Sequence, residues 1–277
     1  MNILIPTDFS ENAHNAIRYA LDYFAHIPVN FYILHVSQKA SPEIEDELYF
    51  ESDLAVPTLR NPSALLKEEI NTCRISAKNS EHNFFPLQDE SSLVESIRKQ
   101  IVEKQIDYIV MGTRGASKNS KNEIGSNTCE VIKKVKCPIL AIPENARYRG
   151  VENLAFVTDY NCIYRNKIIS TLSETLELHN TPLRVLHVKS QATSGLTAGQ
   201  TDNKGFLHYF FRDKKHSFHF VESKKMEMGI QDFVETWDIS LISIAAKNLN
   251  FIERLLLKPA IEAVSYHTHV PFLVIHE

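Results

Sequence analysis

The stretch that decides the fold is 107–144, DYIVMGTRGASKNSKNEIGSNTCEVIKKVKCPILAIPE. An apolar run at 108–111 leads into a glycine-containing loop, and a segment of helical periodicity at about 126–136 precedes a second apolar run at 138–142. Two short apolar runs separated by a helix are typical of parallel strands joined by a crossover. The C-terminal stretch 240–277, SLISIAAKNLNFIERLLLKPAIEAVSYHTHVPFLVIHE, aligns with it without a gap.

The repeat extends outward from this stretch to nearly the whole chain. NILIPTDFS at 2–10 aligns with NLAFVTDYN at 153–161, and YILHVS at 32–37 aligns with RVLHVK at 184–189. Self-similarity of this kind indicates copies of one structural unit. The chain of 277 residues is also long enough for about two domains. We therefore predict two tandem domains, at 1–146 and 150–277, with the seam near 145–150.

Strands and helices alternate within each copy. In the first copy we expect strands at 3–6, 31–36, 83–87, 108–111 and 138–142. We expect helices after Ser10, at 63–77, after Leu93 and at 126–136. This alternation predicts two tandem doubly wound, mainly parallel, five-stranded sheets of the Rossmann-like α/β class, with helices on both faces.

The end of the first strand carries a carboxylate whose role is open. Ser10 can N-cap the following helix, because its hydroxyl suits that position. Asp8 is the alternative cap. A carboxylate at the carboxyl end of a strand is also well placed for a ribose hydroxyl or a magnesium ion.

Two segments match no element of the repeat. They are 38–62, which includes EIEDELYFESD, and 190–215, which includes SQATSGLTAGQTDNKG. Both follow the second strand of their copy, at the edge where an open α/β sheet carries its binding crevice. They are expected to be either lids over that crevice or polar insertions on the surface.

Three glycines in the first copy form the motif G-x2-G-x9-G-S. They are Gly112, Gly115 and Gly125, followed by Ser126, and the first 149 residues contain no other glycine. Glycines at a strand end and a helix start let the backbone approach a phosphate, and the helix N-terminus supplies N–H groups and positive potential. Ser126, with Asn127 and Thr128 after it, would add hydrogen bonds from side chain or backbone. Turn glycines without a ligand are the plainer alternative.

These features together resemble the universal stress protein family. The resemblance rests on ILIPTDFS, the HV ending of the second strand, the complete glycine motif and the strand CPILAIP. It implies a fold of the adenine-nucleotide alpha-hydrolase-like group and, in the ATP-binding branch, a bound ATP with or without Mg²⁺. The implied site residues are Pro6, Thr7, Asp8, Val36, Met111, Gly112, Gly115, Gly125 and Ser126, with Arg114 and Asn127 in the same loop.

The second copy departs from the glycine motif. Ala245 and Asn248 align with Gly112 and Gly115, and Lys258-Pro259 align with Gly125-Ser126. We therefore expect a degenerate second half, although Thr158-Asp159 could still bind something small.

The resemblance also implies how the two copies pack. In the family, the last strand of the domain pairs across a dimer interface. The two last strands of this chain, 138–142 and 271–275, are therefore expected to pair within the chain as a pseudo-dimer. A homodimer of whole chains is a further expectation.

Composition excludes several classes of protein. The net charge of −4 implies no bulk attraction to nucleic acid or to an anionic membrane surface. No apolar stretch approaches the about 20 residues that a membrane span needs, which favours a cytoplasmic protein. The four cysteines form no CxxC pair, so neither zinc nor a disulfide framework is indicated. His35 and His187 occupy matching places and are expected to be buried, hydrogen-bonded side chains rather than catalytic bases.

The leading hypothesis is an ATP-binding, non-enzymatic regulatory protein of the stress response, with at most slow hydrolysis. The sequence has no Walker lysine motif and no His/Ser/Asp constellation with clear spacing beside the glycines, and only one obvious acid is expected near the phosphates. The alternative is an enzyme that processes adenine nucleotides, by hydrolysis or nucleotidyl transfer. That alternative lacks a Ser-Gly-Gly loop or a His-x-Gly-His turn, because the stretch after the first strand reads PTDFSENAHNA.

Overall fold

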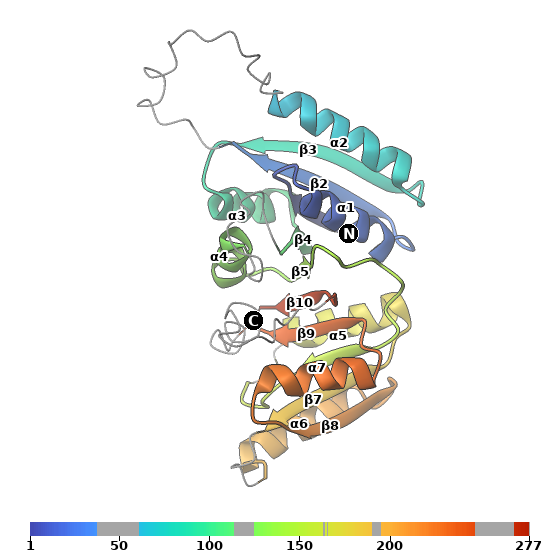
Figure 1. Cartoon of the computed structure of the whole chain (residues 1–277), viewed down its shortest axis with the longest axis vertical. Helices are drawn as coiled ribbons and strands as arrows, with labels where there is room; N and C mark the ends of the chain where they lie inside the picture. Colours follow the sequence, from blue (N-terminus) through green and yellow to red (C-terminus); the bar gives the residue numbers. More distant parts are fainter. Residues whose placement is uncertain are drawn as a thin grey trace.

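The computed structural model describes residues 1–37, 61–113, 125–162, 164, 166–189, 195–246 and 269–276. Its strands form one ten-stranded sheet along the long axis of the molecule, in the order β3-β2-β1-β4-β5-β10-β9-β6-β7-β8 (Figure 1). The second half of this order mirrors the first when each is read outward from the centre. The predicted α/β class, with mainly parallel strands and alternating helices, is confirmed, and the two expected five-stranded sheets are joined into one.

The first half contains nine elements of the alternating pattern. They are β1 (Asn2–Pro6), α1 (Glu11–Tyr23), β2 (Val29–Val36), α2 (Pro62–Ser76), β3 (His82–Asp89), α3 (Leu93–Lys104), β4 (Tyr108–Gly112), α4 (Ser126–Lys134) and β5 (Ile139–Ile142). The hydroxyl of Ser10 accepts a hydrogen bond from the Ala13 N–H at 3.2 Å, so Ser10 caps α1 as expected. The alternative with Asp8 as the cap is wrong, because its Oδ1 accepts instead from the Ser10 N–H at 3.1 Å.

The second half repeats the pattern. Its described elements are β6 (Leu154–Val157), α5 (Asn166–His179), β7 (Leu183–Lys189), α6 (Ala198–Phe210), β8 (His216–Glu222), α7 (Met226–Thr236), β9 (Leu241–Ala245) and β10 (Phe272–Ile275). The expectation that 190–215 fits no repeat element is wrong, because α6 occupies the same place between strands as α2. In the other unmatched segment, 38–62, residues 38–60 lie outside the described residues.

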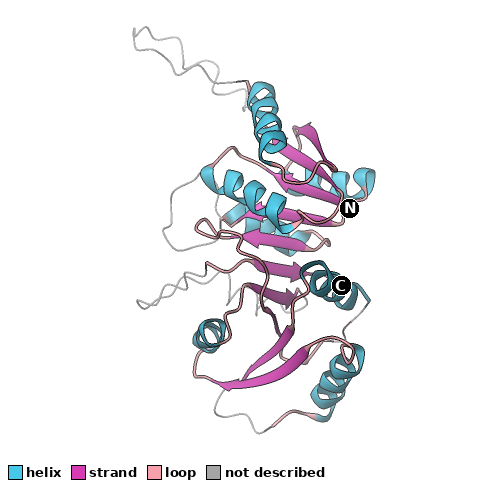
Figure 2. Cartoon of the chain, turned by 90° about the vertical axis from the view of Figure 1, so that its right-hand side faces the viewer, coloured by secondary structure: helices cyan, strands magenta, loops and turns pink. Residues whose placement is uncertain are grey.

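Helices cover both faces of the sheet (Figure 2). One face is packed by apolar side chains of α1, α2, α5 and α6, and the other by those of α3, α4 and α7. Each of these two cores runs through both halves without a break. Burial of a common core by two repeats explains why the halves form one continuous body.

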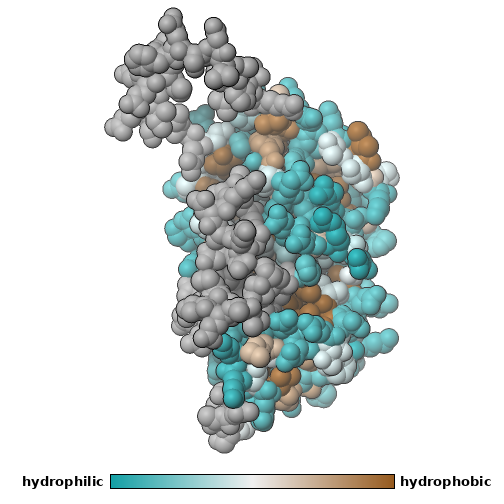
Figure 3. All heavy atoms as spheres, viewed as in Figure 1, coloured by the Kyte–Doolittle hydropathy of each residue, from teal (hydrophilic) through white to brown (hydrophobic). Residues whose placement is uncertain are grey.

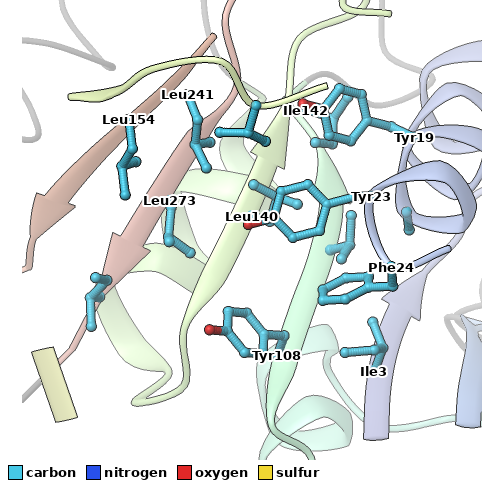
Figure 4. Close-up of a cluster of buried hydrophobic side chains, with 14 of the residues drawn as sticks. Ile3, Tyr19, Tyr23, Phe24, Tyr108, Leu140, Ile142, Leu154, Leu241 and Leu273 are labelled. Carbon is cyan, nitrogen blue, oxygen red and sulfur yellow. The ribbon is translucent and has the colours of Figure 1, made fainter. Parts of the chain in front are cut away.

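The two halves join edge to edge. β5 and β10 are antiparallel, and Leu140 faces Leu273, its own counterpart in the repeat (Figure 4). Ile139 faces Val274 and Ala141 faces Phe272, so a local two-fold axis passes between the two leucines. Both leucines are fully buried. The predicted pairing of the last strands within one chain is confirmed, and it covers two sheet edges that would otherwise be open.

Aromatic side chains fill the seam above this strand pair. Tyr23 of α1 lies 4.2 Å from the ring of His179, at the end of α5, and 6.2 Å from the ring of Tyr148 in the connecting segment. The Tyr148 hydroxyl is 3.3 Å from His179 Nδ1. Asn15 of α1 donates to the carbonyls of Pro143 and Ala146. The connection between the halves is therefore packed against the core.

Where Figure 3 colours the described residues, the surface is mostly hydrophilic with small separated apolar patches. None of the helices within the described ranges is both long and apolar enough to cross a membrane.

Candidate functional site

The predicted site residues gather at the carboxyl ends of three neighbouring strands. β1 pairs in parallel with β2 on one side and with β4 on the other. Strand order therefore reverses between β1 and β4, which is where open α/β sheets bind ligands. Pro6, Val36 and Gly112 are the last residues of these three strands. The topology brings these parts of the predicted site to one edge.

A tight turn follows β1 at this edge. The Thr7 N–H donates to the Leu34 carbonyl at 2.8 Å, and the buried Thr7 hydroxyl accepts from the Phe9 N–H at 3.1 Å. Phe9 has a φ of 60°, in the left-handed region that side chains rarely adopt. Asp8 stands exposed between them. The turn is held from both sides, so it presents the Asp8 carboxylate at a fixed place.

The end of β2 contributes Val36, which is partly buried against the core. Val36 lies beside Asp89, the last residue of β3. Asp89 accepts hydrogen bonds from the N–H and hydroxyl of Ser91 and pairs with Lys99 at 3.0 Å. These contacts, led by the hydroxyl of Ser91, hold the pKa of Asp89 below its ordinary value. Sequence reasoning missed this carboxylate, although the spacing Asp-x-Ser before a helix could have indicated it.

The strand β4 and the helix α4 are tied together at the glycine motif. The Thr128 hydroxyl donates to the Gly112 carbonyl at 2.8 Å, and the Gly125 N–H donates to the Thr113 carbonyl at 2.6 Å. Thr113 in turn donates to Ile142 at 2.9 Å. The Thr128 hydroxyl is therefore a structural tether, and any phosphate contact of this residue would fall to its backbone. Thr113 was not singled out from the sequence.

The two described glycines of the motif serve different purposes. A Cβ on Gly112 would lie 2.6 Å from Asn12 Nδ2, which is closer than real contacts allow, so any other residue there would force the Asn12 side chain of α1 to shift. Gly125 is the N-cap of α4 with a φ of −58°, which any residue can adopt. Because Gly125 has no side chain, the backbone at the start of α4 stays accessible. Met111, before Gly112, is buried.

The N-terminus of α4 carries the remaining described site residues. Ser126 and Asn127 are exposed in its first turn, and no side chain among the described residues caps the helix. An uncapped N-terminus leaves backbone N–H groups and positive potential for an anion. Arg114 and Gly115 lie outside the described residues.

The second half repeats the first turn closely. The Thr158 N–H donates to Leu186 at 2.9 Å, its hydroxyl accepts from the Tyr160 N–H at 3.0 Å, and Tyr160 has a φ of 57°. Asp159 accepts from the Asn161 N–H at 2.9 Å, as Asp8 accepts from Ser10. Asn248, Lys258 and Pro259, which replace the glycine motif, lie outside the described residues.

The matching histidines also agree between the halves. Nδ1 of His35 is 3.0 Å from the Thr7 carbonyl oxygen, and Nδ1 of His187 is 3.0 Å from that of Thr158. A carbonyl oxygen only accepts, so Nδ1 carries the proton in both rings. Both rings are hydrogen-bonded as expected, although His35 is only partly buried.

Comparison with known proteins agrees with this fold. The model of the universal stress protein family matches residues 1–143. A universal stress protein from Archaeoglobus fulgidus is 18% identical with a TM-score of 0.64, over 99% of this chain and 96% of that one. A putative universal stress protein from Pseudomonas aeruginosa is 14% identical with a TM-score of 0.59, over 99% of this chain and 92% of that one. Comparison with curated proteins finds no match. The family match over half of the chain establishes that this protein belongs to the universal stress protein family.

Proposed function

We propose that the first half binds ATP and that the chain is a nucleotide-occupied regulatory protein rather than an efficient enzyme. The observation that carries the proposal is the meeting of Asp8, Val36 and the start of α4 at one edge of the sheet. That edge is where the strand order reverses. An anion and a flat base could be held there by different elements at once.

The residues fit the parts of a nucleotide in a consistent order. Val36 offers an apolar contact for the base, and the Asp8 carboxylate suits a ribose hydroxyl or a Mg²⁺ ion. The uncapped start of α4, with Gly125 as its N-cap, suits the phosphates. Pro6, Thr7, Met111 and Gly112 would line the site through their backbone, and Arg114, Gly115, Ser126 and Asn127 would complete the phosphate loop.

The contacts of the carboxylates near the strand ends favour nucleotide binding over turnover. Asp89 is engaged by Ser91 and Lys99, so it supports the fold rather than serving as a base. Among the residues that the structure describes at this edge, Asp8 is the carboxylate that we assign to the ligand, and one carboxylate does not make an acid–base pair. We propose slow hydrolysis at most, and a hydrolysis assay would show it as turnover far below the about 10 s⁻¹ that is typical of enzymes.

The proposal is tested by the identity of the ligand. Nucleotide released from freshly purified protein and analysed by mass spectrometry should be an adenine nucleotide. In nucleotide-free protein, MgATP should raise the thermal midpoint, because a ligand that binds only the folded state adds about 2.7 kcal/mol at a hundredfold excess over its Kd. MgGTP is the matched control and should raise it less. A midpoint that millimolar MgATP leaves unmoved contradicts the proposal.

A further inference from the structure

A separate cavity of about 240 Å³ opens in the second half, at the carboxyl ends of β7 and β8. Among the described residues, its wall includes His187 and Lys189 of β7, Phe220 of β8, and Leu196 and Gln200 at the start of α6. It lies on the opposite half of the molecule from the proposed nucleotide site, near the outer end of the sheet (Figure 1).

Helix α6 is fixed over this edge by its own polar side chains. Gln200 Nε2 donates to the Asp159 carbonyl at 2.8 Å, and Asn203 Nδ2 donates to the Tyr160 carbonyl at 2.8 Å. Gln200 also closes a capping box with Thr197 at the helix start. These bonds hold the helix against the turn after β6, so the cavity is formed in advance rather than assembled by a ligand.

Aromatic rings make one wall of the cavity. The His187 ring stacks on the buried ring of Tyr160, with centroids 5.3 Å apart and an interplanar angle of 28°. Phe220 meets His187 edge-on, 5.8 Å away, and is 44% exposed. A half-exposed phenyl ring inside a cavity wall offers apolar surface to a flat ligand.

His187 supplies a directed polar group. Its Nδ1 donates to the Thr158 carbonyl, so its Nε2 carries the lone pair and can only accept. The residue is 8% exposed, and Nε2 makes no hydrogen bond to another of the described residues. At the rim, Lys189 Nζ pairs with Glu222 Oε1 at 2.7 Å, and Lys204 Nζ lies over the Phe220 ring, 5.1 Å from its centroid, so both described lysines there are already engaged by side chains of β8.

The corresponding place in the first half is built differently. In the register of neighbouring strands, His187 lies opposite Phe220, whereas His35 lies opposite Gln88. Lys189 corresponds to Ser37, the residue after the Val36 that aligns with Val188. The first half keeps the ring contact between Phe9 and His35, with centroids 4.6 Å apart. Phe220 and the rim ion pair therefore distinguish the second half, which points to a ligand of another class.

We propose that this cavity binds a compact, uncharged aromatic ligand of one or two rings, which packs against Phe220 and donates an N–H or O–H to His187 Nε2. The volume favours such a ligand, because it falls below the about 300 Å³ at which pockets for larger ligands begin. The inference does not rest on nucleotide binding in the first half.

Calorimetric titration of the full chain with indole tests this site, since indole has two rings and one N–H donor. With saturating MgATP present, indole should bind at one site per chain. The matched probe 1-methylindole lacks the donor and should bind about three- to tenfold more weakly. Absence of indole binding, equal affinity of the two probes, or displacement of indole by MgATP would each overturn the proposal.

Three variants assign the site to its residues. His187→Phe keeps a ring on Tyr160 and should remove the difference between indole and 1-methylindole. Phe220→Ala should weaken both probes about tenfold. His35→Phe is the matched change in the first half and should alter neither. Thermal midpoints of the variants separate loss of the site from loss of the fold, and preserved probe discrimination in folded His187→Phe contradicts the assignment.

Discussion

The two halves share one scaffold and differ at the edge of the sheet where the parallel strands end. The turn after the first strand has the same hydrogen bonds in both halves, at Thr7 and at Thr158. An aromatic residue with left-handed backbone angles, Phe9 or Tyr160, follows in each. Beyond the turn, the first half offers an uncapped helix after glycine, whereas in the second half α6 bonds directly to the turn. The strand-end turn is therefore part of the fold, and the ligands that we propose for the two halves depend on the elements around it.

The largest effect is expected from transferring the second-half residues into the first half. Gly125→Lys with Ser126→Pro should weaken ATP binding by about a hundredfold or more, because it adds a lysine side chain, replaces the Ser126 hydroxyl by a proline ring and removes one N–H donor. The fold should survive, since proline suits the first helical position and Gly125 has φ −58° and ψ 146°, which a residue before proline can adopt. Titration calorimetry measures the binding and circular dichroism the fold.

The reverse change is the control for this transfer. Lys258→Gly with Pro259→Ser should restore little nucleotide binding in the second half, because Ala245 and Asn248 still replace the first two glycines. Undiminished ATP affinity in the first double variant would show that the phosphate site lies elsewhere.

Truncating a leucine on either side of the β5–β10 seam should lower the stability of the protein by a similar amount. Leu140→Ala and Leu273→Ala should each lower the free energy of unfolding by about 2–5 kcal/mol, because both side chains are fully buried and face each other across the two-fold axis. Urea denaturation of both single variants and of the double variant measures this. Because the two contact each other, their effects should not add. Very unequal costs would contradict an equivalent seam.

Acid should weaken the seam from the α5 side, through His179. Burial, aided by His26, lowers the pKa of His179 from its ordinary 6.5 to about 4. The unfolded chain therefore takes up this proton first, so the stabilisation is complete above pH 6.5 and is lost as pH falls toward 4, up to about 3 kcal/mol. Urea denaturation at pH 7.5 and 5 should show a smaller pH dependence in His179→Phe than in the wild type. An unchanged pH dependence contradicts this role.

The smallest expected effect is a change in stability when glycine and alanine are exchanged at the matching ends of β4 and β9. Gly112→Ala should cost about 1–3 kcal/mol, because the new methyl group meets the buried Asn12. Ala245→Gly, the reverse change in the second half, should cost about 0.5–1 kcal/mol through backbone entropy alone. Thermal denaturation compares the pair, and a neutral Gly112→Ala would show that Asn12 moves aside freely.

Most of the fold was predictable from the sequence because its elements are strongly periodic and buried. Helix α6 was not, since Gly199, Asp202 and Gly205 are poor helix formers. Its stability comes from the capping box and from tertiary bonds such as Gln200 to Asp159, and only the Thr197-x-x-Gln200 spacing was readable in advance.

The place of the candidate site in the fold could be inferred from the sequence more readily than its detail. The strand order brings Asp8, Val36 and Gly112 to one edge of the sheet, and their role in binding stays a prediction. That Gly112 is needed for packing depends on Asn12, which is distant in sequence, and the cavity beside Phe220 depends on the placement of α6. Contacts of this kind arise only after the elements have packed.

The number of nucleotides bound per chain tests the central claim most directly. Titration of nucleotide-free wild-type protein with MgATP should give a stoichiometry near one, with binding lost in the Gly125→Lys, Ser126→Pro variant. A stoichiometry near two, or near one with the variant unaffected, would contradict an account in which the first half alone holds the nucleotide.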